Sequence, residues 1–122
     1  MVSTVDEPSM VFIARHDLKM SAGKLAVQCS HAAVSCTLNA RKTHARLVER
    51  WRNAGARKIC LRADDLATLQ RLAGQAQAAG LVTHFVKHAG HTEVPPGTGT
   101  VLGLGPAPRR AIDALVSELK PY

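Results

Sequence analysis

Residues 10–36 read MVFIARHDLKMSAGKLAVQCSHAAVSC, a short apolar run followed by a polar loop and a long alanine-rich segment. The run Met10–Arg15 is rich in strand formers, which predicts a buried strand. From about Ala22 to Asn39 the apolar spacing predicts a helix that packs one side on a sheet, with Ser21 suited to cap its N-terminus. The residues expected on the packed side are Leu25, Ala26, Cys29, Ala32, Ala33 and Cys36.

The remainder of the chain continues the alternation of helices and strands. Turn signals and apolar patterning predict helices at 43–55, 64–80 and 107–120, and strands at 57–63, 81–87 and 100–106. Asp64 is a plausible N-cap and Gly80 a plausible stop for the middle helix. The sequence therefore predicts an α/β fold with a four-stranded mixed sheet.

The connections predict how these strands pair. Helical crossovers imply parallel pairing for most strands, whereas the helix-free connection 88–99 predicts an antiparallel last strand. We expect residues 1–9 to form a flexible N-terminal tail and residues 10–122 to form one domain. In an open sheet of this kind, ligands favour the loops beyond the carboxyl ends of the strands.

Composition points to a soluble cytoplasmic protein with no membrane association. The chain has 122 residues, of which 46% are apolar, and no run approaches the ~18 apolar residues that a spanning helix needs. Its first ten residues carry acids where a signal peptide needs bases. Three cysteines are too few and odd in number for a closed disulfide framework. Cys29 and Cys36 would lie about 10 Å apart along the helix, beyond disulfide reach, so we expect small buried thiols.

The positive charge of the chain is concentrated in residues 41–62. This segment holds eight bases and one acid, Glu49, and so accounts for the whole net charge of +7. A localised basic field suits a polyanion such as a nucleic acid; the alternative is a solvated basic face without a partner. The four aromatic residues are too few for a base-stacking platform, which favours recognition of phosphates.

A polar stripe on the first helix is one candidate site. Lys24, Gln28, His31 and Ser35 follow helical spacing on one side, and such a stripe can simply face solvent. However, Lys24 lies in a first turn whose free amide groups attract anions. A phosphate or a developing oxyanion is therefore a plausible ligand there.

Residues 87–100, KHAGHTEVPPGTGT, form a second candidate site. His88, His91, Thr92 and Thr100 lie near the end of a predicted strand and in the following loop. No third residue shows the spacing of a metal ligand set, and no GxGxxG fingerprint opens a helix. We therefore predict neither a metal nor an organic cofactor. The alternative is that these are ordinary loop histidines.

The quoted motifs resemble the type II peptidyl-tRNA hydrolases, the archaeal and eukaryotic class, which also has bacterial members. The opening motif is DLKMSAGKLAVQCSHAAV at 17–34, and the resemblance continues through 57–81 and 89–108 to the final LKPY. It implies a three-layer α/β/α sandwich, commonly a homodimer, that hydrolyses the ester joining a peptide to the terminal ribose of tRNA.

The resemblance also implies roles for individual residues. Lys24 falls on the functional lysine of the family and Gln28 on its helix glutamine, while Thr92 and Thr100 fall on the threonines of the late motif. His31 is a further site candidate. The tRNA backbone would be bound by Lys19, Arg41, Lys42, Arg46 and Arg50.

His88 departs from the family pattern. The family typically reads Asp-Ala-Gly-x-Thr where this chain reads HAGHT, so an imidazole replaces a carboxylate held to be important for catalysis. A neutral imidazole can accept a proton from water, with an unperturbed pKa of ~6.5. The lead hypothesis is a hydrolase in which His88 acts on water and Lys24 stabilises negative charge. The alternatives are another acyl transfer or cyclisation at the same site, and a tRNA-binding module without catalysis.

Overall fold

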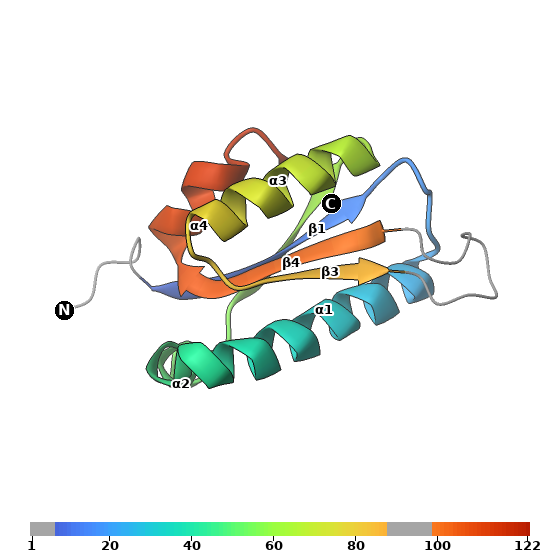
Figure 1. Cartoon of the computed structure of the whole chain (residues 1–122). Coiled ribbons are helices and arrows are strands. Elements are labelled where there is room, and N and C mark those ends of the chain that lie inside the picture. Colours follow the sequence, from blue (N-terminus) through green and yellow to red (C-terminus); the bar gives the residue numbers. More distant parts are fainter. Residues whose placement is uncertain (1–6, 88–98) are drawn as a thin grey trace.

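The computed structural model describes residues 7–87 and 99–122. Strands and helices alternate along the chain, as the α/β prediction requires (Figure 1). In chain order they are β1 (Pro8–Arg15), α1 (Ala22–Thr43), α2 (Ala45–Asn53), β2 (Lys58–Ala63), α3 (Leu66–Ala78), β3 (Thr83–Lys87), β4 (Gly99–Pro108), α4 (Arg109–Val116) and β5 (Lys120–Pro121).

The described residues form a sheet of five strands in the order β3-β4-β1-β2-β5, so the prediction of four strands is wrong. The additional strand is β5, which pairs antiparallel with β2 through Leu61↔Pro121 and Arg62↔Lys120. Two residues are too short to show a strand period, and proline is tolerated only where no ladder hydrogen bond is required of it, as at an edge. Residues Lys120 and Pro121 therefore carry no strand signal of their own.

The pairing prediction was also wrong in part. Among the described strands only β1 and β2 pair in parallel, whereas β4 is antiparallel to both of its neighbours, β1 and β3. The antiparallel last strand is thus confirmed, but parallel pairs are in the minority because β4 lies between β1 and β3. Strands β1, β2 and β3 still run in one direction, so their carboxyl ends share one edge of the sheet.

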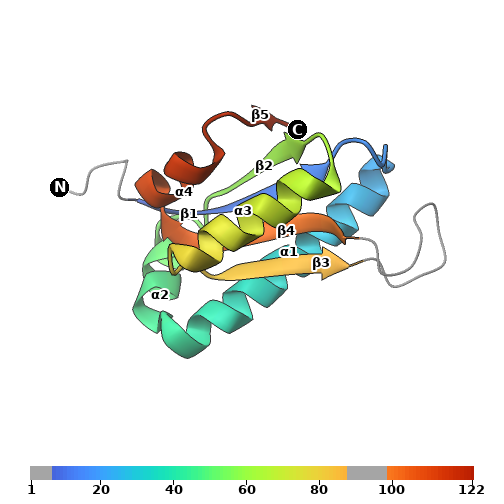
Figure 2. The ribbon, with the colours of Figure 1, turned by 45° about the horizontal axis from the view of Figure 1, so that its top comes forward.

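Helices cover both faces of the sheet. α1 and α2 lie against one face and α3 and α4 against the other (Figures 1 and 2). The side chains of β1 alternate between the two cores: Met10 and Phe12 pack on the α1 side, and Val11 and Ile13 on the α3 side. A strand covered on both faces reads as a continuous apolar run, which explains the sequence signal of β1.

Helix α1 packs largely the predicted side on the sheet, because Ala32 and Cys36 are buried and Leu25, Cys29 and Ala33 are half-buried against the same core. Its buried residues are Gln28, Ala32, Cys36 and Ala40, a strict i, i+4 series, while Ala26 is exposed. These small side chains let the helix approach β4 closely: a Cβ on Gly103 would lie 2.8 Å from the Cys36 Sγ and 3.1 Å from the Ala32 Cβ. Gly103 therefore sets the distance between α1 and the sheet.

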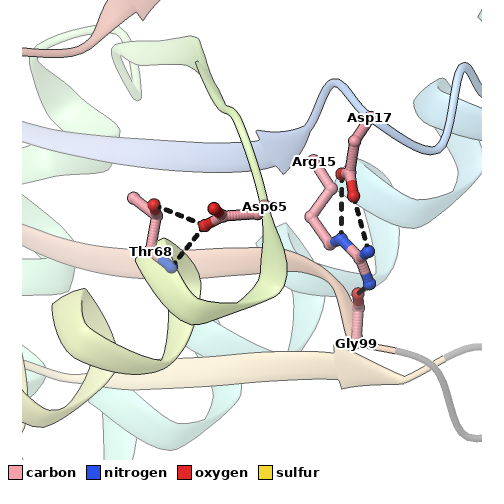
Figure 3. A network of polar contacts seen from close by, with 5 residues as sticks. All are labelled: Arg15, Asp17, Asp65, Thr68 and Gly99. Carbon is pink, nitrogen blue, oxygen red and sulfur yellow. Dashed lines mark hydrogen bonds and ion pairs between the residues drawn. The ribbon is translucent and has the colours of Figure 1, made fainter.

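Two helix caps were predicted from the sequence. The Ser21 side chain accepts a hydrogen bond from the Lys24 amide at the start of α1, as predicted. At the start of α3 the cap is Asp65 and not Asp64: its Oδ1 accepts from the Thr68 amide at 2.9 Å and from the Thr68 hydroxyl at 2.7 Å (Figure 3). Both aspartates suit a cap by composition, and only the backbone path selects between them.

Candidate functional site at the sheet edge

One edge of the sheet holds the start of α1 and the described ends of the second candidate segment. The carboxyl ends of β1 and β3, the beginning of β4 and the N-terminus of α1 all lie at this edge (Figures 1 and 2). The loop Asp17–Met20 leads from β1 into α1 there. Lys87 and Gly99 of the second candidate segment end β3 and begin β4 at the same edge.

Lys24 lies in the first turn of α1 and its side chain is half-buried. The Ser21 Oγ accepts from the Lys24 backbone amide at 3.2 Å. The first turn of α1 contains no acidic residue, so no carboxylate of the helix itself occupies the positive end of the dipole. An anion bound there would be attracted by the free amide groups of the helix start and also by the ammonium group of Lys24.

Gln28 lies one turn further along α1 and is only 3% exposed. It belongs to the buried series that packs on β4, and not to a solvent-facing stripe. His31 is exposed and Ser35 half-buried. The predicted stripe therefore divides: Gln28 is buried and Lys24 half-buried, whereas His31 is exposed.

Thr100 is fully buried, and its hydroxyl donates to the Val86 carbonyl at 3.3 Å. The ladder shifts at this point, because Val86 pairs with Val101 and Lys87 with Gly99. Thr100 is thus the additional residue of an irregularity in β4, a feature that often re-aims side chains beside functional sites. On β4, Gly103 lies opposite Ala32 and Cys36 of α1. Since a strand rises about 3.3 Å and a helix about 1.5 Å per residue, Thr100, three residues before Gly103, lies at about the level of Gln28.

An ion pair at this edge was missed by the sequence reasoning. Arg15, the last residue of β1, binds both carboxylate oxygens of Asp17, with Nε–Oδ1 3.1 Å and Nη2–Oδ2 2.8 Å (Figure 3). Its Nη1 also donates to the Gly99 carbonyl at 3.2 Å. An arginine two residues before an aspartate at a strand end was the available signal. The guanidinium ties the loop before α1 to the beginning of β4.

The Asp17–Met20 loop has a defined path. The Lys19 amide donates to the His16 carbonyl at 3.2 Å, and Lys19 has a φ of 50°, in the left-handed region. Few side chains adopt that region without support from surrounding contacts. The Lys19 side chain is exposed at the same edge as Lys24.

The other predicted tRNA contacts lie at the far end of α1. Arg41 and Lys42 are in its last turn, Arg46 and Arg50 follow on α2, and all four are exposed. At about 1.5 Å per residue, the helix separates Arg41 from Lys24 by roughly 25 Å. We call Arg41, Lys42, Arg46 and Arg50 the basic surface. A ligand that contacts both the basic surface and Lys24 must be about as long as this separation, which is much of one turn (~34 Å) of a nucleic-acid double helix.

Two other bases of the 41–62 segment have structural partners. The Arg57 Nη1 donates to the buried Ser9 hydroxyl at 2.6 Å. The Lys58 Nζ donates to the Ala56 carbonyl at 2.7 Å and lies 5.1 Å from the centroid of the Trp51 ring. The charge of the segment is therefore not all available to a ligand.

The predicted residues His88, His91 and Thr92 lie outside the described residues. Among residues 7–87 and 99–122, no group of three or more His, Cys, Asp or Glu side chains is placed to hold a metal ion. In the same part of the chain, no helix has the length and apolar character to cross a membrane.

Comparison with known protein families shows to which family the chain belongs. Residues 8–122 match the family described as peptidyl-tRNA hydrolase PTH2. The chain belongs to this family. The match begins at the first residue of β1 and ends at the last residue of the chain, so it includes both candidate segments.

Individual relatives of the family agree over the same range. A peptidyl-tRNA hydrolase of Pyrobaculum aerophilum is 44% identical over 115 residues, which cover 93% of this chain and 96% of the relative. The human and bovine proteins named peptidyl-tRNA hydrolase 2, mitochondrial, are each 40% identical over 116 residues. The match covers 95% of this chain but 65% of those two mammalian proteins.

Proposed function

We propose that this protein hydrolyses peptidyl-tRNA, releasing the peptide and a tRNA with a free terminal ribose. The family match over residues 8–122 carries this proposal, and the positions of Lys24 and Gln28 on α1, at the sheet edge where β4 begins, support it. The relatives named above are peptidyl-tRNA hydrolases by name. The helices on both faces of the sheet support the α/β/α architecture that the family resemblance implies.

The reaction assigns a step to each group. Water attacks the ester carbonyl carbon, the bond from that carbon to the ribose oxygen breaks, and the ribose oxygen takes up a proton. Lys24 stabilises the negative charge that develops on the carbonyl oxygen, the kind of contribution that preorganised donors make in esterases. His88 accepts the proton of the attacking water, and Gln28 and Thr92 position water or substrate. No metal or organic cofactor enters these steps.

The fully buried Thr100 has a supporting role in this proposal. Its hydroxyl already donates to the Val86 carbonyl, so it fixes the beginning of β4 against β3 beside Lys87. We assign Thr100 as a positioning residue; His31 is exposed on the side of α1 that also carries Val27 and Val34.

The basic surface supplies the electrostatic part of tRNA binding. Arg41 and Lys42 are exposed on the last turn of α1, and Arg46 and Arg50 are exposed on α2. Lys19 extends the positive charge to the site edge. Phosphate contacts of this kind position a nucleic acid without reading its sequence. The separation along α1 supports an arrangement in which the terminal ribose reaches Lys24 while the adjoining duplex lies on the basic surface.

We further propose that the protein is a homodimer, as the family resemblance implies. Val27, Val34 and Leu38 expose 50%, 59% and 51% of their surface along one side of α1, a stripe suited to a second copy. The proposed location is the cytoplasm; the mammalian relatives, by contrast, carry the word mitochondrial in their names.

Hydrolysis of an N-blocked aminoacyl-tRNA tests the proposal. We expect release of the blocked amino acid by the wild-type protein, loss of release in His88→Ala, and retained release in His88→Asp, which restores the family carboxylate. A wild-type protein that releases nothing while His88→Asp is active would overturn the proposal. So would tRNA binding at low salt without any cleavage, because that result identifies a binding module.

A further inference from the structure

Two of the three cysteines lie side by side although 31 positions separate them in the sequence. Cys29 comes from α1 and Cys60 from β2, and their Sγ atoms are 4.0 Å apart. Both are free thiols and both are half-buried. Cys36, in contrast, is fully buried, and burial raises its pKa to about 12.

The surroundings of this thiol pair are mostly apolar. Leu25 and Ala33 of α1 and Ala56, just before β2, pack in the same cluster as both cysteines. The chain end lies beside it, because the Tyr122 amide donates to the Cys60 carbonyl at 3.0 Å. Tyr122 is itself 39% exposed, so the pair lies near the surface and not deep in a core.

The two thiols are not equivalent. The hydrogen bond between them lowers the pKa of Cys60 and raises the pKa of Cys29. A thiol that donates to a neighbouring sulfur stabilises the thiolate of that neighbour. With Cys29 as the donor, Cys60 is the sulfur that reacts first with an electrophile, since the thiolate is the nucleophile.

We propose that Cys29 and Cys60 form a reversible oxidation site, in which a hydroperoxide converts the dithiol into a disulfide that links α1 to β2. The Cys60 thiolate attacks a peroxide oxygen, the O–O bond breaks, and Cys60 becomes a sulfenic acid while the peroxide leaves as hydroxide or alkoxide. The Cys29 sulfur then attacks the Cys60 sulfur, the S–O bond breaks, and water leaves with the proton of Cys29. Two electrons pass from the two sulfurs to the peroxide.

The geometry requires a small movement for this bond. A disulfide joins its sulfurs at about 2.05 Å, so the two Sγ atoms must approach by about 2 Å. Cys29 follows Gln28 directly and lies on the side of α1 that faces β2. The disulfide thus fixes the part of α1 that carries the candidate site. The thiol pair does not depend on the proposed hydrolysis, so the two can fail separately.

Mass measurement of the whole protein treated with hydrogen peroxide tests this inference. We expect the intact mass to fall by about 2 Da, with two of the three thiols becoming unreactive and both recovered on addition of dithiothreitol. Digestion with trypsin under non-reducing conditions should then release peptide 25–41 joined by a disulfide to peptide 59–62. Because residues 25–41 also contain Cys36, the same link must form in Cys36→Ala, which keeps the thiol pair intact.

Variants of the pair supply the remaining outcomes. In Cys29→Ala the link should vanish and a sulfenic acid at Cys60 should become trappable with dimedone. Oxygen addition without the linked peptides, in the wild type and in Cys36→Ala alike, would overturn the inference. Disulfide formation only between molecules, recognised by its dependence on protein concentration, would overturn it as well.

Discussion

Arg15 binds both carboxylate oxygens of Asp17 and at the same time donates to the Gly99 carbonyl. The side chain of Arg15 is only 12% exposed, against 37% for Asp17. A planar guanidinium can satisfy this fork and a third acceptor together, which an ammonium cannot. One side chain thus joins the end of β1, the loop before α1 and the beginning of β4, three of the segments that meet at the candidate site.

Replacing Arg15 should weaken both the fold and the activity. We expect Arg15→Ala to lower the free energy of unfolding by roughly 1–2 kcal/mol, because the variant lacks a charged hydrogen-bond network at a partly exposed site. Turnover of N-blocked aminoacyl-tRNA should fall about tenfold through misplacement of the loop. Urea denaturation and steady-state kinetics measure the two effects. Arg15→Lys should not restore them, and full rescue by lysine would contradict the role of the fork.

Lys24→Ala should lower kcat for peptidyl-tRNA hydrolysis by about 10²-fold, the magnitude typical for removal of one oxyanion donor. Because Lys24 is half-buried at a helix start, the free energy of unfolding should change little. Arg71→Ala is the matched control, since it removes a base from α3 on the opposite face of the sheet. Equal decreases of activity in the two variants would contradict a specific role of Lys24.

Substitution of Arg46 and Arg50 together should weaken tRNA binding without altering kcat. Both side chains are exposed on one side of α2. Each phosphate-binding base contributes about one to the slope of log Kd against log salt, so the double variant should reduce this slope by about two. Filter binding of tRNA across a salt series measures this slope. An unchanged slope would indicate that the basic surface is solvated and does not bind tRNA.

Gly103→Ala should destabilise the protein by roughly 1–3 kcal/mol, because the added methyl group overpacks the interface between β4 and α1. The nearest atoms are the Cys36 Sγ at 2.8 Å and the Ala32 Cβ at 3.1 Å. Combining it with Cys36→Ala removes the closer atom and should recover part of the stability. Thermal denaturation of the four proteins of this double-mutant cycle checks the coupling, and strict additivity would rule out a direct interaction.

Asp65 should contribute to the pH dependence of stability. Its hydrogen bonds from Thr68, and to a lesser degree the charge of Arg15, hold its pKa below the ordinary value of 3.8. A depressed pKa in the folded state gives stability that is present above 3.8 and is lost as the pH falls through the lower folded value. Asp65→Asn keeps a capping side chain but cannot titrate, so its melting temperature should fall less between pH 5 and pH 2. Asp64→Asn should behave as the wild type does.

The sequence predicted the regular elements well where one periodicity dominated. β1 reads as an apolar run because both of its faces are covered, and Ser21 was identified because a cap is a local hydrogen bond. The N-cap of α3 was assigned to Asp64 instead of Asp65 because two adjacent aspartates carry the same composition signal. β5 was missed because Lys120 and Pro121 form a strand only through pairing with β2, a long-range interaction without a local pattern.

For the candidate site, too, some features followed from the sequence and others only from the tertiary structure. The sequence by itself determined the α/β alternation, the basic segment, the motif residues Lys24 and Gln28, and the family, since these depend on residue type and spacing along the chain. Only the tertiary structure decided that β4 inserts between β1 and β3, that Gln28 turns inward while His31 faces outward, that Arg15 reaches Gly99, and that Cys29 meets Cys60. Each of these depends on which distant segments share a surface, and that choice is made by the packing of the whole core.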